Sequence, residues 1–217
     1  MPEIKIDICE IFYSLQGEST FVGLPCIFIR LSGCNLHCSW CDTDYANHES
    51  RAMTLDQILP QITSYHCRLV EITGGEPLLQ NNTAHLISCL VEKNYRVLLE
   101  TNGSRSIKNI HPACIKIMDI KCPSSNESDS FLHENIKFLT ESDELKFVIA
   151  DREDYEFAKS IIKNRLSRIS RGKIHLSPVF GRIKPEMIAR WMLDDHLDAR
   201  LSLQQHRMIW CPDKRGV

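Results

Sequence analysis

The stretch Cys34-Asn35-Leu36-His37-Cys38-Ser39-Trp40-Cys41-Asp42-Thr43 places three cysteines in the spacing C-x3-C-x2-C. Such a short loop can turn all three sulfurs toward one cluster, and thiolates are soft ligands that suit iron–sulfur or zinc sites. A cubane cluster has four irons, so three cysteines leave one iron without a protein ligand. Metal chemistry takes place at an open position, whereas a closed site is usually structural. We therefore interpret the loop as the cradle of a catalytic 4Fe–4S cluster.

Zinc is the alternative metal for this loop. Tetrahedral zinc normally takes four protein ligands, often from two paired Cys/His knuckles. His37 is too close in sequence to the cysteines to complete a tetrahedron easily, and the chain has no second C-x2-C. The remaining seven cysteines are scattered singly, mostly among apolar neighbours. We expect most of them to pack in the core.

Composition sets the broad class of the protein. The 217 residues suffice for one domain with a sizeable core, and the net charge of −2 comes without a broad basic stripe for nucleic acid. The most basic stretch, residues 159–173, is expected to be a solvated helix face rather than an RNA-binding one. No apolar run approaches the ~18 residues of a membrane span, and the start lacks a signal peptide's apolar segment. We expect a cytoplasmic protein without a membrane partner.

Strands and helices alternate along the chain, which predicts an α/β fold with a mostly parallel sheet flanked by helices. Strands are expected at 4–15, 26–31, 69–73, 95–100, 114–120, 144–150, 173–177 and 200–204, and helices at 54–65, 84–93, 131–139, 153–166 and 184–193. Residues 123–130 are polar and expected to be mobile, and residues 206–217 form a tail without a regular pattern. With no repeat and no linker, residues 1–217 are expected to form a single domain.

Polar loops follow the ends of several predicted strands. They are the cysteine loop, Gly74-Gly75-Glu76-Pro77, Thr101-Asn102-Gly103 and residues 121–125. Ligand sites of α/β barrels gather at the carboxyl edge of the strands, so these loops are expected to share one site. Consecutive glycines also let a ligand approach the backbone closely. Alone, the glycine turn would be an ordinary strand–helix connection; beside the cysteine loop it indicates a binding site.

The three cysteines together with Gly74-Gly75-Glu76-Pro77 resemble the radical S-adenosylmethionine (SAM) superfamily. The resemblance implies a single domain with the fold of a partial, incomplete TIM-like barrel. This barrel is abbreviated in its helices, which are shorter than those of a full barrel. The resemblance also implies that the amino and carboxylate groups of SAM bind the open iron and that the Gly-Gly-Glu turn meets the methionine amino group. The aromatic ring of Trp40 would lie near the adenine. Reductive cleavage of SAM would then give a 5′-deoxyadenosyl radical that takes hydrogen from the substrate.

A narrower resemblance covers nearly the whole chain and keeps the order of the motifs. The chain is similar to the 7-carboxy-7-deazaguanine synthase family in six segments. They are Leu15-Gln16-Gly17-Glu18, residues 30–36, 40–43, 100–103 and 119–125, and the tail from Gln205. This implies conversion of 6-carboxy-5,6,7,8-tetrahydropterin to 7-carboxy-7-deazaguanine with release of ammonia, on the route to queuosine-type bases. SAM would act catalytically. Mg2+, a reductant such as flavodoxin or ferredoxin, and a homodimer are also implied.

The resemblance assigns residues to each part of the site. The cluster would be held by Cys34, Cys38 and Cys41; SAM would be bound by Trp40, Cys41, Asp42, Gly74, Gly75, Glu76, Lys121 and Ser124; the pterin by Leu15, Gln16, Gly17, Arg30, Thr73, His206 and Val217; and Mg2+ by Thr43. The N-terminal β segment and the C-terminal tail, ending in the Val217 carboxylate, would close the site.

Elementary chemistry agrees with two of these roles. The Arg30 guanidinium can take a carboxylate in a bidentate pair, although a salt bridge at the strand end is the alternative. The hydroxyl of Thr43 is a hard donor suited to Mg2+; by itself the residue would be interpreted as part of a turn.

Two rival functions stay open at this stage. One is a radical SAM activase that acts on a partner protein. Such activases share the small size and the three-cysteine loop of this chain. The match at Arg30, at residues 119–125 and in the tail would then be accidental. The other rival is a zinc-binding module without enzymatic activity.

Overall fold

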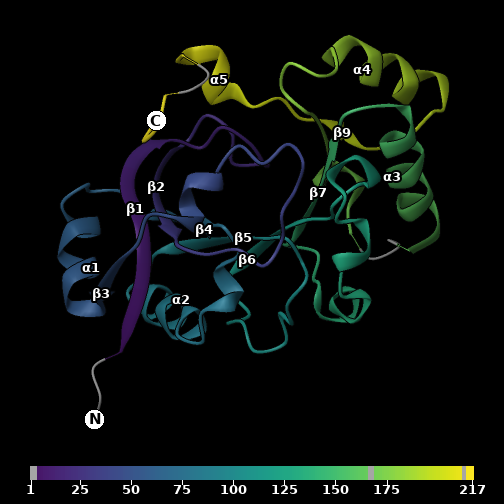
Figure 1. Ribbon diagram of the computed structural model, residues 1–217. Coiled ribbons are helices and arrows are strands. Elements are labelled where there is room, and N and C mark those ends of the chain that lie inside the picture. The colour runs from purple at the N-terminus through teal and green to yellow at the C-terminus, as the bar shows by residue number, and fades with distance from the viewer. Residues whose placement is uncertain (1–3, 166–168, 212–213) are drawn as a thin grey trace.

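The computed structural model describes residues 4–165, 169–211 and 214–217 (Figure 1). Within these ranges the strands form one sheet in the order β3-β1-β2-β4-β5-β6-β7-β8-β9. Their bounds are β1 (Lys5–Leu15), β2 (Pro25–Leu31), β3 (Arg51–Thr54), β4 (Leu69–Gly74), β5 (Arg96–Thr101), β6 (Ile115–Asp119), β7 (Glu144–Ile149), β8 (Ile174–Pro178) and β9 (Arg200–Leu201). β1 pairs antiparallel with β2 and β3, whereas β2 and β4 to β9 are parallel.

The sheet does not close, because β3 and β9 are its two edges and do not pair with each other. Parallel neighbours require crossover connections, which here contain α1 (Leu55–Thr63), α2 (Thr83–Glu92), α3 (Arg152–Arg165) and α4 (Pro185–Asp194). The connections after β5 and β6 contain no α-helix, and the second of them has only short 3-10 helices. The predicted partial barrel, abbreviated in its helices, is therefore confirmed.

The core lies between the helices and one face of the sheet. Alternating residues of each strand, such as Ile27 and Ile29 of β2 or Val97 and Leu99 of β5, are fully buried there. The opposite, inner face carries an apolar cluster that includes Phe28. Polar side chains lie on the same face, nearer the carboxyl edge of the strands. Because successive side chains of a strand point to opposite faces, one strand supplies both the core and the site.

Local sequence signals set several boundaries. Thr54 caps α1, and its backbone N–H donates to Gln57 Oε1 at 3.0 Å, as the predicted capping box requires. Pro185 occupies the first turn of α4, where its missing N–H costs no helical hydrogen bond. None of the described helices is long and apolar enough to span a membrane.

Some predicted elements differ from the structure. β3 was not predicted; it is only four residues long and pairs with the edge of β1. The helix expected at 131–139 is a 3-10 helix, His133–Phe138. Residues 123–130, expected to be mobile, form the 3-10 helices Pro123–Ser125 and Ser128–Ser130, and the first of these is hydrogen-bonded to the cysteine loop. The tail contains α5 (Gln205–Ile209), and part of the basic stretch, 166–168, lies outside the described residues.

Candidate active site

A cavity of about 470 Å³ opens on the inner face of the sheet, at the carboxyl edge of the parallel strands. This volume lies within the range of small-molecule sites. Most of the residues predicted for the site line it: Leu15, Gln16, Gly17, Arg30, Cys34, Cys38, Trp40, Cys41, Asp42, Thr43, Thr73, Gly74, Gly75, Lys121, His206 and Val217. Glu76 and Ser124 are the two predicted residues that do not, and each instead holds a residue of the cavity wall in place.

The cysteine loop is packed directly against the glycine turn. Gly74 has a φ of +145°, which glycine adopts without strain. A Cβ at Gly75 would lie 2.2 Å from the carbonyl oxygen of Gly33, and the backbone N–H of Glu76 donates to the same oxygen at 2.8 Å. The sequence suggested that these glycines admit a ligand. The structure adds that they let two loops meet backbone to backbone.

The three thiols face the same cavity and none is in a disulfide. Burial raises the pKa of Cys34 and raises that of Cys38 to about 11, while the positive charge of Lys121 lowers both. The Cys34 sulfur accepts hydrogen bonds from the Leu36 N–H at 3.4 Å and from Asn102 Nδ2 at 3.9 Å. No three acidic, His or Cys side chains of the described chain gather closely enough for a single ion. The donor set fits a multi-iron cluster, in which each cysteine binds a different iron.

Glu76 acts behind the cavity wall. Its carboxylate is fully buried and accepts hydrogen bonds from the Thr101 hydroxyl at 2.9 Å, the Asn102 N–H at 2.7 Å and the Leu78 N–H at 2.9 Å. The side chain therefore fixes the loop after β5 beside the cysteine loop. Of the Gly-Gly-Glu turn, the two glycines reach the cavity and the glutamate side chain does not.

Ser124 likewise positions a neighbour. Its Oγ accepts a hydrogen bond from Trp40 Nε1 at 3.1 Å and donates to the Asp154 carboxylate. Lys121 Nζ lies 5.3 Å from the centre of the Trp40 ring and 2.8 Å from Asp119 Oδ2. The indole is thus held from its edge and faced by an ammonium group, so Trp40 presents a fixed ring to the cavity.

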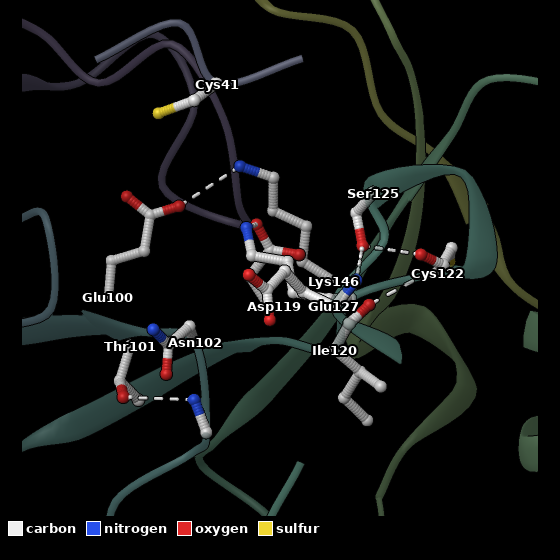
Figure 2. Close-up of polar contacts among 12 residues, drawn as sticks. Cys41, Glu100, Thr101, Asn102, Asp119, Ile120, Cys122, Ser125, Glu127 and Lys146 are labelled. Carbon is white, nitrogen blue, oxygen red and sulfur yellow. Dashed lines mark hydrogen bonds and ion pairs between the residues drawn. The ribbon is translucent and has the colours of Figure 1, made fainter. Parts of the chain in front are cut away.

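A cluster of charged residues that the sequence analysis missed forms the cavity floor. Lys146 of β7 extends to Glu100 of β5, with Nζ 3.1 Å from Oε1 (Figure 2). It also pairs with Glu18, and the Thr73 hydroxyl donates to Glu100 Oε2 at 2.9 Å. Burial opposes ionisation of Glu100, but the charge and hydrogen bond of Lys146 hold its pKa below the usual range.

A signal for this cluster was present in the sequence. Glu71 is the only charged residue of β4, and Glu100 and Lys146 stand in largely apolar strands whose first residue carries the one other charge. A lone charge in a buried strand must find a partner or a solvated cavity, because an unpaired buried charge is costly. The pattern identifies such positions but does not say which charge meets which.

Replacing Lys146 with methionine should lower the free energy of unfolding by about 3 kcal/mol, because two largely buried carboxylates lose their cation. Since the pKa of Glu100 is lowered to about 2 in the fold, this stability is fully present above the ordinary glutamate pKa of about 4.3 and is progressively lost as pH falls from there through about 2. Urea unfolding at pH 7 and pH 3 measures both. Lys137→Met, whose side chain is 75% exposed, is the control and should change little. Equal stability of Lys146→Met and wild type at pH 7 would contradict the pairing.

The C-terminal tail crosses the carboxyl edge of the sheet and places α5 beside the end of β1 (Figure 1). The backbone N–H of Gln205 donates to the Gly17 oxygen at 2.8 Å, and Gln204 Nε2 donates to Glu18 Oε1 at 2.8 Å. Arg207 Nη2 lies 2.9 Å from Asp42 Oδ2, next to the third cysteine of the loop. The tail therefore joins the turn after β1 to the cysteine loop across the cavity.

His206 packs so closely on Gly17 that an alanine there would clash. A Cβ at Gly17 would lie 2.1 Å from His206 Nδ1, so Gly17→Ala should push α5 away from the cavity. We expect kcat/KM to fall roughly 10- to 100-fold, the scale of a small misplacement of site residues. Hydrogen exchange of residues 205–209 should rise in parallel. Gly172→Ala is the control, because the atom nearest to the added Cβ is 4.0 Å away, and it should change neither kcat/KM nor hydrogen exchange. Unchanged hydrogen exchange in Gly17→Ala would argue against the packing of α5 on Gly17.

Arg30 makes the strand-end ion pair that was its alternative role and also lines the cavity. Its Nε donates to Glu10 Oε1 at 2.8 Å, and the Tyr45 hydroxyl donates to the same oxygen at 2.9 Å. The two remaining guanidinium nitrogens have no hydrogen-bond partner among the described residues. The ion pair thus orients the guanidinium through Nε and leaves its two terminal nitrogens available for a bidentate contact.

Comparison with known proteins agrees with this geometry. Residues 28–188 match the Radical SAM superfamily. The chain is 43% identical to the 7-carboxy-7-deazaguanine synthase of Koribacter versatilis, over 98% of this chain and 100% of that protein. It is 44% identical to the synthase of the same name from Chlorobaculum tepidum, over 99% of both chains.

The fold agrees as well. The crystal structure of QueE from Escherichia coli superimposes with a TM-score of 0.77 at 24% identity, over 93% of this chain and 95% of that one. Full-length relatives that share one name confirm the synthase resemblance over the activase and zinc alternatives. The chain therefore belongs to the radical SAM superfamily and, within it, to the 7-carboxy-7-deazaguanine synthase family.

Proposed function

We propose that this chain converts 6-carboxy-5,6,7,8-tetrahydropterin to 7-carboxy-7-deazaguanine with release of ammonia, in the biosynthesis of queuosine-type 7-deazapurines. The observation that carries the proposal is that three thiols and a polar floor open onto one cavity of about 470 Å³. When bound, the cluster and SAM supply the radical that takes hydrogen from the substrate. SAM would thus serve as a catalyst rather than as a consumed reagent.

The residues of this chain divide the work of binding. Cys34, Cys38 and Cys41 would hold the cluster, and Trp40 with the glycine turn would bind SAM. The open end of the Arg30 guanidinium would pair with the substrate carboxylate, a charge-assisted bidentate contact. Gln16 and Thr73, which line the cavity beside the charged floor, would meet the polar edge of the pterin.

The tail would close the cavity over the bound substrate. His206 and Val217 line the cavity from the C-terminal segment, and Leu15 and Gly17 line it from the turn after β1. Together they would exclude water, which strengthens every polar contact inside the site. Residues 1–217 would form one core domain, with the first strand and the tail as its closing parts.

We further propose that Thr43 would help to hold a Mg2+ ion, which would neutralise charge on the substrate carboxylate. The Thr43 hydroxyl lines the cavity 3.9 Å from the Cys41 sulfur, and a hydroxyl oxygen suits this hard cation. A cytoplasmic homodimer that takes electrons from flavodoxin or ferredoxin completes the proposal.

An anaerobic assay tests the function. Reconstituted brown protein is incubated with SAM, dithionite and the carboxypterin, with and without Mg2+, and products are separated by mass. We expect 7-carboxy-7-deazaguanine and ammonia in equal amounts, many turnovers per SAM, and a higher rate with Mg2+. Cluster-loaded protein that forms no deazaguanine would exclude the proposed reaction. A rate that does not respond to Mg2+ would exclude only the proposed role of Mg2+ and would leave the proposed reaction standing.

A further inference from the structure

The floor of the cavity holds more carboxylates than cations. Glu18, Glu71 and Glu100 line it together with one lysine, Lys146. Lys146 pairs with Glu18 and with Glu100. Of the other cations that line the cavity, Arg30 pairs with Glu10, Lys121 with Asp119 and Arg207 with Asp42, and Arg182 forms no ion pair among the described residues. One of the three carboxylates is therefore left without a cationic partner.

That carboxylate is Glu71. Only 4% of the residue is exposed, and its partner is the neutral amide of Gln16. An isolated buried carboxylate is too costly to stay ionised, so such a group takes up a proton. Burial raises the pKa of Glu71 well above the usual range of a carboxyl, and the negative charges of Glu100 and Glu18 raise it further, against the opposing charges of Lys146 and Arg30.

The hydrogen bonds around Gln16 show where the proton resides. The Glu18 N–H donates to Gln16 Oε1 at 3.0 Å, which fixes which end of the amide is oxygen. Gln16 Nε2 must then be the donor to Glu71 Oε2. Because Oε2 accepts, the proton belongs on Oε1. Oε1 has no hydrogen-bond partner among the described residues, and Glu71 is part of the cavity wall.

We propose that Glu71 stands in the cavity as a neutral carboxylic acid and that its Oε1–H donates a hydrogen bond to an acceptor on the pyrimidine edge of the pterin. This rests on the proposed function for the identity of the ligand. A pterin lactam offers a carbonyl oxygen beside an N–H, which a carboxylic acid matches with one donor and one acceptor. An ionised carboxylate would have only acceptors to offer and would repel the carbonyl oxygen. Glu71 is thus a specificity-determining residue.

Glu71→Gln separates protonation from shape, because an amide keeps one donor and one acceptor but does not titrate. Isothermal titration of cluster-loaded protein with the carboxypterin, without SAM, is run from pH 6 to pH 9. Wild-type affinity should fall by up to about tenfold per pH unit above the pKa of Glu71. The affinity of Glu71→Gln should follow only the titration of the ligand itself. At pH 6 the two proteins should bind the carboxypterin alike, and an affinity of Glu71→Gln more than tenfold below that of wild type at pH 6 would overturn the proposal.

Infrared difference spectra test the protonation without any substrate. Wild type minus Glu71→Gln at pH 7 should show the C=O stretch of a protonated carboxyl, and circular dichroism checks that the variant is folded. A carboxylate pair of bands at that position would overturn the proposal. If wild-type protein bound no carboxypterin at all, the proposed function would fail, while the infrared result would still decide the state of Glu71.

Discussion

Cys38→Ala should abolish the formation of 7-carboxy-7-deazaguanine and leave protein that stays colourless after anaerobic reconstitution. Cys38 is one of three thiols that face the cavity, and two thiolates leave a second iron without a protein ligand. Iron and sulfide content, the visible absorption spectrum and turnover are measured together. We expect less than about a thousandth of wild-type turnover, since losing the radical source costs far more than losing one hydrogen bond.

A matched cysteine serves as the control for this variant. Cys89 lies on α2 and does not line the cavity. Cys89→Ala should therefore keep the brown colour and the activity. A Cys38→Ala protein that still held a full complement of cluster iron and turned over substrate would overturn the assignment of the loop.

Arg30→Ala should keep the brown colour and lose most of its activity. Removing one partner of a buried, hydrogen-bonded charge pair costs about 2 to 5 kcal/mol, which is at least about 30-fold in substrate affinity. The loss should fall mainly on KM for the carboxypterin, because the cysteine loop is left intact. Steady-state kinetics and iron content of the same preparation measure both.

Glu10→Gln distinguishes the two roles of Arg30. This variant weakens the ion pair at 2.8 Å but leaves the guanidinium in the cavity wall. If Arg30 binds the substrate, Glu10→Gln should change KM only a few-fold. A Glu10→Gln enzyme as impaired as Arg30→Ala would show that the strand-end ion pair, rather than substrate binding, is what the enzyme needs.

The sequence predicted the parts of the site that are continuous in the chain. The cysteine loop and the Gly-Gly-Glu turn are short segments that directly follow apolar strands, so their chemistry and place at the carboxyl edge could be inferred together. The alternation of strand-like and helix-like segments along the chain also predicted the parallel strands. It missed β3 because four residues at the edge of a sheet show too little periodicity.

The roles of single side chains were harder to predict. Glu76 and Ser124 were assigned to SAM, which stays a prediction; the structure shows their side chains holding Asn102 and Trp40 in place. A motif identifies which loop forms the site. It does not show which face of the loop each side chain takes, because that depends on the packing of neighbouring loops.

The sequence by itself determined the cluster loop, the parallel strands with the helices α1 to α4, and the family, because each is encoded by residues close together in the chain. Only the tertiary structure decided that Glu18, Glu71, Glu100 and Lys146 share one floor and that α5 covers the turn at Gly17. These contacts join strands and segments far apart in sequence. Pairing among several buried charges depends on distance and desolvation, which the sheet sets when it folds.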